Sequence, residues 1–143
     1  MRTIADENIM IDENKKRLIE IAQRMFDDNP YLTMATSSKS GDPWIAPMMY
    51  AADKADNFYW VSASDAVHSQ HIAENPRIAL VLFDSNPGYG NAQALYCKGT
   101  ATMLEGDDLE IGCEVFYSMR YPDSKEREIK GRTPADFCGD SPG

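Results

Sequence analysis

The sequence lacks an excess of positive charge. Its 14 Lys and Arg residues are outnumbered by 23 Asp and Glu residues, which gives a formal net charge of −9 over 143 residues. A surface of this sign repels phosphate backbones and anionic lipid headgroups, so we expect neither nucleic acid nor a membrane as a partner. No apolar run approaches the ~20 residues of a membrane-spanning helix, and no signal-peptide pattern opens the chain.

Cysteine, histidine and catalytic motifs are also scarce. Cys97, Cys113 and Cys138 are widely spaced and form no CxxC pair, so we expect reduced thiols in a cytoplasmic protein and no metal site. The sequence has no GxGxxG, P-loop, GxSxG or His–Glu metal motif, and no pair of carboxylates stands out for acid–base work. It therefore identifies no catalytic residue.

The first half of the chain predicts one helix and two strands. A helix is expected from Asp12 to the Asn29-Pro30 stop, because apolar residues recur with the spacing of one helical face at Leu18, Ile21, Ala22, Met25 and Phe26. Strands are expected at 31–37 and 44–51, on either side of a turn. Pro47 removes a ladder donor, which places the second strand at a sheet edge or at a bulge.

The stretch 58–83 reads as strand, turn, short helix and strand. Residues 58–62 and 77–83 are compact aromatic and aliphatic runs typical of strands. Between them, Ser64 or Asp65 is expected to cap a helix of about ten residues, which Asn75-Pro76 ends.

The last part predicts a strand at 93–104 with a bulge at Gly99, and then a helix capped by Asp107 or Asp108. We assign 1–11 to a loose N-terminal leader, 12–121 to a single domain, and 122–143 to a polar C-terminal tail. Short turns between strands and few helices indicate a mainly β (α+β) fold. We expect a small antiparallel split β-barrel with flanking helices.

One place in this pattern favours binding of an anion. Ser62, Ser64, His68 and Ser69 crowd the start of the short helix, where unpaired N–H groups and the helix dipole attract negative charge. Two hydroxyls and an imidazole would add donors for a phosphate. The alternative is that Ser64 only caps the helix and that His68 is a solvated surface residue.

Three segments then carry a resemblance to a known family: TMATSSKSGDPWIAPMMY, NFYWVSASDAVHSQHIAENPRIALVLFD and QALYCKGTATML. Their order and spacing resemble the pyridoxamine 5′-phosphate oxidase-like, flavin-binding split-barrel family over roughly residues 28–120. The most specific part is the strand, the Ser-rich turn, the helix ending in Asn-Pro-Arg, and the apolar strand after it.

The resemblance implies a homodimer of split barrels with FMN in the cleft between the subunits. Its phosphate would lie at the turn that contains Ser62, Ala63, Ser64, His68 and Ser69. The flavin ring would rest against the strand that contains Pro47, Met48, Met49 and Tyr50. The partner subunit would contribute residues around Gln93 and Tyr96.

The sequence departs from this family in two ways. The oxidases themselves carry an Arg-Lys pair at the phosphate turn, where this chain has Val67 and His68. Family members also return after the second helix with a strand that helps to close the barrel, and residues 120–143 contain no such pattern. The residues that recognise pyridoxamine phosphate are not evident either, so we do not predict that activity.

Three functions are consistent with this sequence. The first is an FMN-dependent oxidoreductase acting on a small molecule, in which the flavin carries the redox chemistry. The second is a non-catalytic module that binds or senses flavin, a deazaflavin or haem, the last through His68 or His71. The third is a structural dimer without cofactor. A dimer is expected because the large apolar strand residues exceed what one short barrel buries, namely Trp44, Met48, Met49, Trp60 and Tyr96.

Overall fold

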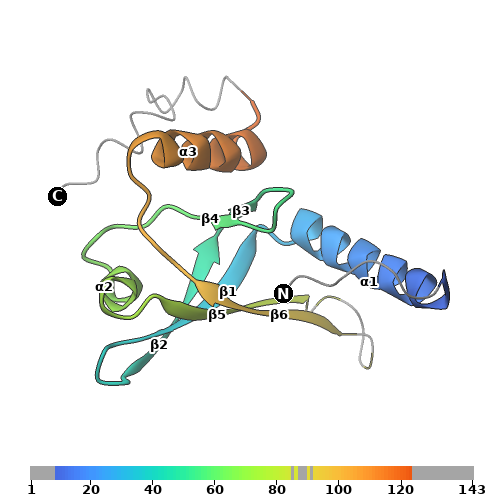
Figure 1. Cartoon of the computed structure of the whole chain (residues 1–143), viewed down its shortest axis with the longest axis horizontal. Coiled ribbons are helices and arrows are strands. Elements are labelled where there is room, and N and C mark those ends of the chain that lie inside the picture. The colour runs from blue at the N-terminus through green and yellow to red at the C-terminus, as the bar shows by residue number, and fades with distance from the viewer. Residues whose placement is uncertain (1–8, 85, 87–89, 91, 124–143) are drawn as a thin grey trace.

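The computed structural model describes residues 9–84, 86, 90 and 92–123 (Figure 1). Its helices are α1 (Ile9–Asp28), α2 (Val67–Glu74) and α3 (Gly106–Arg120). Its strands are β1 (Tyr31–Ser37), β2 (Pro43–Met49), β3 (Ala51–Ala52), β4 (Phe58–Tyr59), β5 (Arg77–Asp84) and β6 (Gln93–Thr100).

The main sheet is antiparallel and has four strands in the order β2-β1-β5-β6, while β3 and β4 form a separate two-stranded sheet. Burial alternates along β1 and β5, as expected for strands with one covered face. The covered inner face carries Leu32, Met34, Ile78, Leu80 and Leu82, which pack with Met25 of α1 into the larger core cluster. Ile72 of α2 also packs on this cluster, so both helices lie on the inner face.

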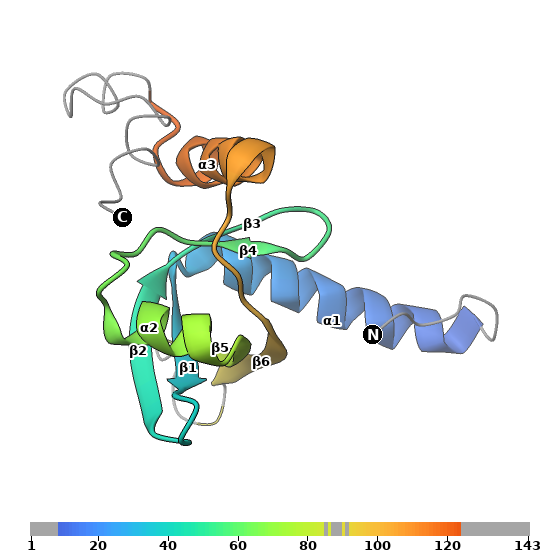
Figure 2. The ribbon, with the colours of Figure 1, turned by 60° about the vertical axis from the view of Figure 1, so that its left-hand side comes forward.

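The third helix belongs to a second, smaller core. Cys113, Phe116 and Tyr117 on one face of α3 are buried together with Ala51 of β3. The helix lies across the β3–β4 hairpin, on the far side from the main sheet (Figures 1 and 2). One residue, Tyr50, separates Ala51 from the end of β2, so the same short stretch of chain connects the two cores.

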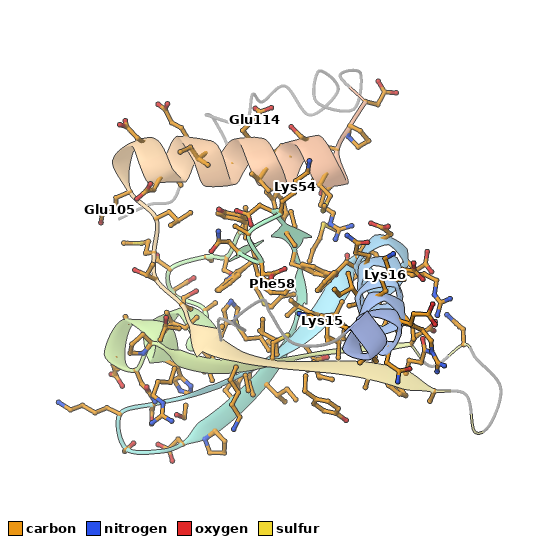
Figure 3. All side chains as sticks on the ribbon, turned by 45° about the vertical axis from the view of Figure 1, so that its right-hand side comes forward. Lys15, Lys16, Lys54, Phe58, Glu105 and Glu114 are labelled. Atoms are coloured by element: carbon orange, nitrogen blue, oxygen red, sulfur yellow. The ribbon has the colours of Figure 1, made fainter. Side chains whose placement is uncertain are left out.

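The first helix extends beyond the sheets. Its N-terminal part projects away from the body in both views (Figures 1 and 2), and residues 13–20 are all exposed. Phe58 lies in the interior, whereas Lys15 and Lys16 of α1 and Glu114 of α3 lie at the surface (Figure 3). The apolar stripe of α1 therefore reaches the core only through its C-terminal half.

Most of the predicted elements are present. The α+β class with antiparallel sheets is confirmed, as are the strand at 31–37 and the edge position of the Pro47 strand. Among the described residues the strands form two sheets and no closed barrel. The first helix begins at Ile9, inside the segment assigned to the leader, and residues 124–143 of the predicted tail lie outside the described part.

Several boundaries were predicted wrongly. The strand expected at 44–51 leaves the main sheet after Met49, and the strand expected at 58–62 is only Phe58–Tyr59. The pairing of β5 with β6 runs without interruption through Ile78 and Gly99, so there is no bulge at Gly99. Cys113 is disulfide-bonded, which contradicts the expectation of a reduced thiol there, whereas Cys97 is free.

Candidate functional site at the start of α2

The segment that leads into α2 differs from the prediction. The helix begins at Val67, and its N-cap is Ala66, in extended conformation, which has no side-chain acceptor to offer. Neither Ser64 nor Asp65 therefore serves as the cap. The first N–H groups of a helix have no partner within the helix, and groups of this kind can bind an anion.

Two of the predicted site residues meet beside this helix start. The Nε2 atom of His68 lies 2.7 Å from the Oγ atom of Ser62, at hydrogen-bonding distance. Burial lowers the pKa of His68, because the charged imidazolium is less well solvated in a partly buried place. The imidazole is therefore neutral at physiological pH, and one ring nitrogen donates while the other accepts.

The other residues of the predicted turn differ in exposure. Ala63 and Ser64 are exposed, and Ser69 in the first turn of α2 is half-buried. Ser62 and His68, which are hydrogen-bonded to each other, are both half-buried. We call Ser62, His68 and the first turn of α2 the α2 seat.

The second histidine has a different place. The Nδ1 atom of His71 lies 3.2 Å from the Oγ1 atom of Thr36, a buried residue of β1. One turn later, the side chain of Asn75 donates to Ser37 Oγ at 2.8 Å. These contacts fasten α2 to β1, and sequence reasoning missed them because the partners are 35 and 38 residues apart.

The strand expected beneath the flavin ring offers fewer side chains than predicted. Met48 and Tyr50 are buried in the core, Met49 is half-buried, and Pro47 is exposed. Alternation along a strand explains this, because successive side chains point to opposite faces. A ligand at this edge would meet Met48 and Tyr50 only through backbone atoms.

The two residues expected from a partner lie on opposite faces of β6. Gln93 shares the inner face with Leu95, and its Oε1 atom accepts a hydrogen bond from Arg24 of α1 at 3.0 Å. Tyr96 lies on the outer face and is 79% exposed. Gln93 is therefore already used within its own chain, whereas Tyr96 is available to a second one.

The outer face of the main sheet, opposite α1 and α2, is rich in exposed apolar side chains. They include Tyr31 of β1, Ile45 of β2, Phe83 of β5 and Tyr96 of β6. A shallow cavity of about 320 Å³ opens on this face, lined by Tyr31, Pro47, Val81 and Phe83 among others. Of the sequence-predicted site residues, Pro47 is the one that reaches this cavity.

Neither a metal centre nor a membrane span is found in the part of the chain that the structure describes. No three His, Cys, Asp or Glu side chains there come together as ligands. No helix there has the length and apolar character needed to cross a bilayer.

Comparison with known proteins identifies the fold. HutZ, the haem storage protein of Vibrio cholerae, has a TM-score of 0.63 at 17% identity, over 78% of each chain. A haem-binding protein from Mycobacterium smegmatis has a TM-score of 0.60 at 20% identity, over 80% of this chain and 46% of that one. ChuZ from Campylobacter jejuni has a TM-score of 0.65 at 13% identity, over 87% and 50%. No curated protein sequence matches this chain.

The sequence profile of the pyridoxamine 5′-phosphate oxidase family matches residues 18–133. That range covers the α2 seat, both sheets and α3. The solved structures that resemble the chain have the same arrangement of strands and helices. The chain therefore belongs to the pyridoxamine 5′-phosphate oxidase-like family.

Proposed function

We propose that this protein binds FMN, with the phosphate at the α2 seat, and acts as a flavin-dependent oxidoreductase. The observation that supports this most directly is the Ser62–His68 pair beside the start of α2. When bound, the flavin supplies hydride or electron transfer, so the chain needs no acid–base pair of its own. Its residues bind and orient the cofactor and exclude water from it.

The local donors outweigh an unfavourable net charge. A charge of −9 repels an anionic phosphate at long range, although salt screens this repulsion beyond ~8 Å under physiological conditions. At contact, each hydrogen bond to a charged group is worth about 1.5–3 kcal/mol. The Ser62 hydroxyl, the neutral His68 ring and the backbone N–H groups of the first turn are such donors. The phosphate would replace the mutual hydrogen bond of Ser62 and His68 with bonds to itself.

The proposed assembly is a homodimer that uses the outer face of the main sheet. Apolar patches of this kind mark interfaces in proteins of this size. Stacking two copies on this face would bury Tyr96, Phe83 and Tyr31, which are more than half exposed in the single chain.

The phosphate placement is tested by the double variant H68A/S69A. Flavin fluorescence quenching measures the affinities of FMN and of riboflavin, which lacks the phosphate. The double variant should lower the affinity for FMN by one to a few powers of ten, at roughly 1.4 kcal/mol per tenfold. The affinity for riboflavin should fall far less. Q70A, an exposed change in the same helix, is the control and should alter neither affinity. Unchanged FMN and riboflavin affinities in the double variant would place the phosphate elsewhere.

Haem binding is the second candidate. HutZ and the M. smegmatis protein are described as storing and binding haem, and they have the same fold as this chain. His68 is neutral and its ring is half-buried, which suits an axial ligand. If haem is the cofactor, titrating the protein with haem gives a shifted Soret band that H68A abolishes, and flavin fluorescence is not quenched. Absence of binding by either cofactor would instead favour a structural dimer.

A further inference from the structure

The chain changes sheets at Tyr50, immediately after the strand proposed to support the flavin ring. Met49 is the last residue of β2 that pairs with β1, and Ala51 already pairs with Tyr59 in the second sheet. Between them, the Tyr50 amide donates to the carbonyl of Pro30 at 3.3 Å. The Tyr50 side chain is fully buried and packs edge-on against Phe26.

The C-terminal end of α3 contacts Tyr50 and Met49. Arg120, the last residue of the helix, donates from Nε to the backbone carbonyl of Tyr50. Its guanidinium lies over the Tyr50 ring, 5.0 Å from the centroid. The next residue, Tyr121, donates from its hydroxyl to the sulfur of Met49 at 3.9 Å. Arg120 and Tyr121, at the end of α3, thus contact Tyr50 and Met49 at the end of the strand.

We propose that Arg120 is a positioning residue for the cofactor: by fixing the Tyr50 carbonyl, it sets the place of the 47–50 strand end on which the ring rests. This inference depends on the proposed function. Because Met48 and Tyr50 are buried, this segment meets a ligand mainly through its backbone, and backbone position decides the quality of such a contact. Arg120 would therefore act on affinity without touching the cofactor.

The energetics favour this role over simple packing. The Nη2 atom of Arg120 is buried and has no hydrogen-bond partner among the described residues, a cost that an apolar side chain of similar length would avoid. An apolar residue, however, would leave the Tyr50 carbonyl without the donor that Arg120 provides. The arginine therefore supplies a hydrogen bond that an apolar side chain cannot supply, and this bond fixes the Tyr50 carbonyl at the junction of the two sheets.

The test compares R120M and R120K with R17M, which makes the same change at an exposed position on α1. The affinities of FMN and riboflavin are measured well below each variant's melting temperature. R120M should lower the affinities for FMN and riboflavin by the same factor, about tenfold (roughly 1.4 kcal/mol), because both flavins make the ring contact. R120K keeps one donor and should recover part of the loss, and R17M should behave like the wild type.

Amide hydrogen exchange of the free protein adds a readout that needs no cofactor. R120M should speed exchange at Tyr50 and Ala51, and R17M should not. Unchanged exchange there, or unchanged riboflavin affinity in R120M, overturns the inference even if the melting temperature falls. Weakening of FMN alone would also overturn it, because it would put Arg120 near the phosphate. If the wild-type protein binds neither flavin, the proposed function is refuted. The exchange result then decides only whether Arg120 fixes the backbone at Tyr50.

Discussion

Substitutions at two neighbouring residues of β5 test whether the inner face of the main sheet is the core and the outer face a dimer interface. Leu82 is fully buried on the inner face, whereas Phe83 is 56% exposed on the outer face. Truncating a fully buried leucine to alanine costs about 2–5 kcal/mol, as lost transfer energy plus a residual cavity. We expect L82A to cost about 3 kcal/mol, which lowers the melting temperature by roughly 6–12 °C for a chain of this size.

The expected result for F83A depends on the proposed dimer. In an isolated chain the half-exposed ring contributes little, so F83A should cost roughly 1 kcal/mol or less. If two copies stack on the outer face, F83A weakens association instead, and the apparent stability of the wild type rises with protein concentration. L82A should lower stability by a similar amount at every concentration.

Urea unfolding of the wild type and both variants, at low and at high protein concentration, measures these quantities. A loss for F83A as large as that for L82A at low concentration would show that the faces of β5 are assigned incorrectly. A stability of the wild type that does not change with concentration, together with a monomer in light scattering, would refute the dimer on the outer face.

Two further predictions concern the β3–β4 hairpin and α3. The side-chain amide of Asn57, followed by the backbone N–H and the Tyr59 hydroxyl, lowers the pKa of Asp53 to about 2. This depressed pKa stabilises the fold above the normal carboxyl pKa of 3.8, and the contribution disappears as pH falls toward 2. D53N should therefore flatten acid unfolding in that window, and an unchanged pH profile would contradict this. A Cβ added at Gly112 would lie 2.6 Å from Leu104, so overpacking of about 1–3 kcal/mol outweighs the gain in helix propensity of ~1 kcal/mol. G112A should lower the melting temperature, and a rise would show that Leu104 moves aside freely.

The strongest local patterns in the sequence predicted the fold well. These patterns are the strand at 31–37, the apolar run of β5 and the apolar stripe on α1. Each one marks a side of its element that must pack against another element, whichever element that is. Pro47 predicted an edge strand for a purely local reason, since proline has no N–H to give to a second neighbour. Such signals do not depend on what lies far along the chain.

The predictions that failed depend on long-range contacts. The strand at 44–51 ends early because Ala51 packs into a second core with α3, more than fifty residues later, while Tyr50 stays in the larger core. Ser64 has the composition of a cap, yet Ala66 occupies that position, because the chain is still extended there. Gly99 pairs with Ile78 across the sheet in an uninterrupted register, with no bulge. No local pattern carries this information.

The two histidines of α2 show how the structure narrows the candidate site. In the sequence they are three residues apart; we assigned His68 to the phosphate turn, and either histidine could serve as a haem ligand. In the fold, His71 bonds to a buried threonine of β1 and so holds the helix in place, while His68 bonds to Ser62 in the preceding loop. Loss of His71 should therefore disturb the whole helix, whereas loss of His68 changes the ligand seat alone. A ligand can compete for His68 without undocking α2, and for that reason we place the cofactor contact there.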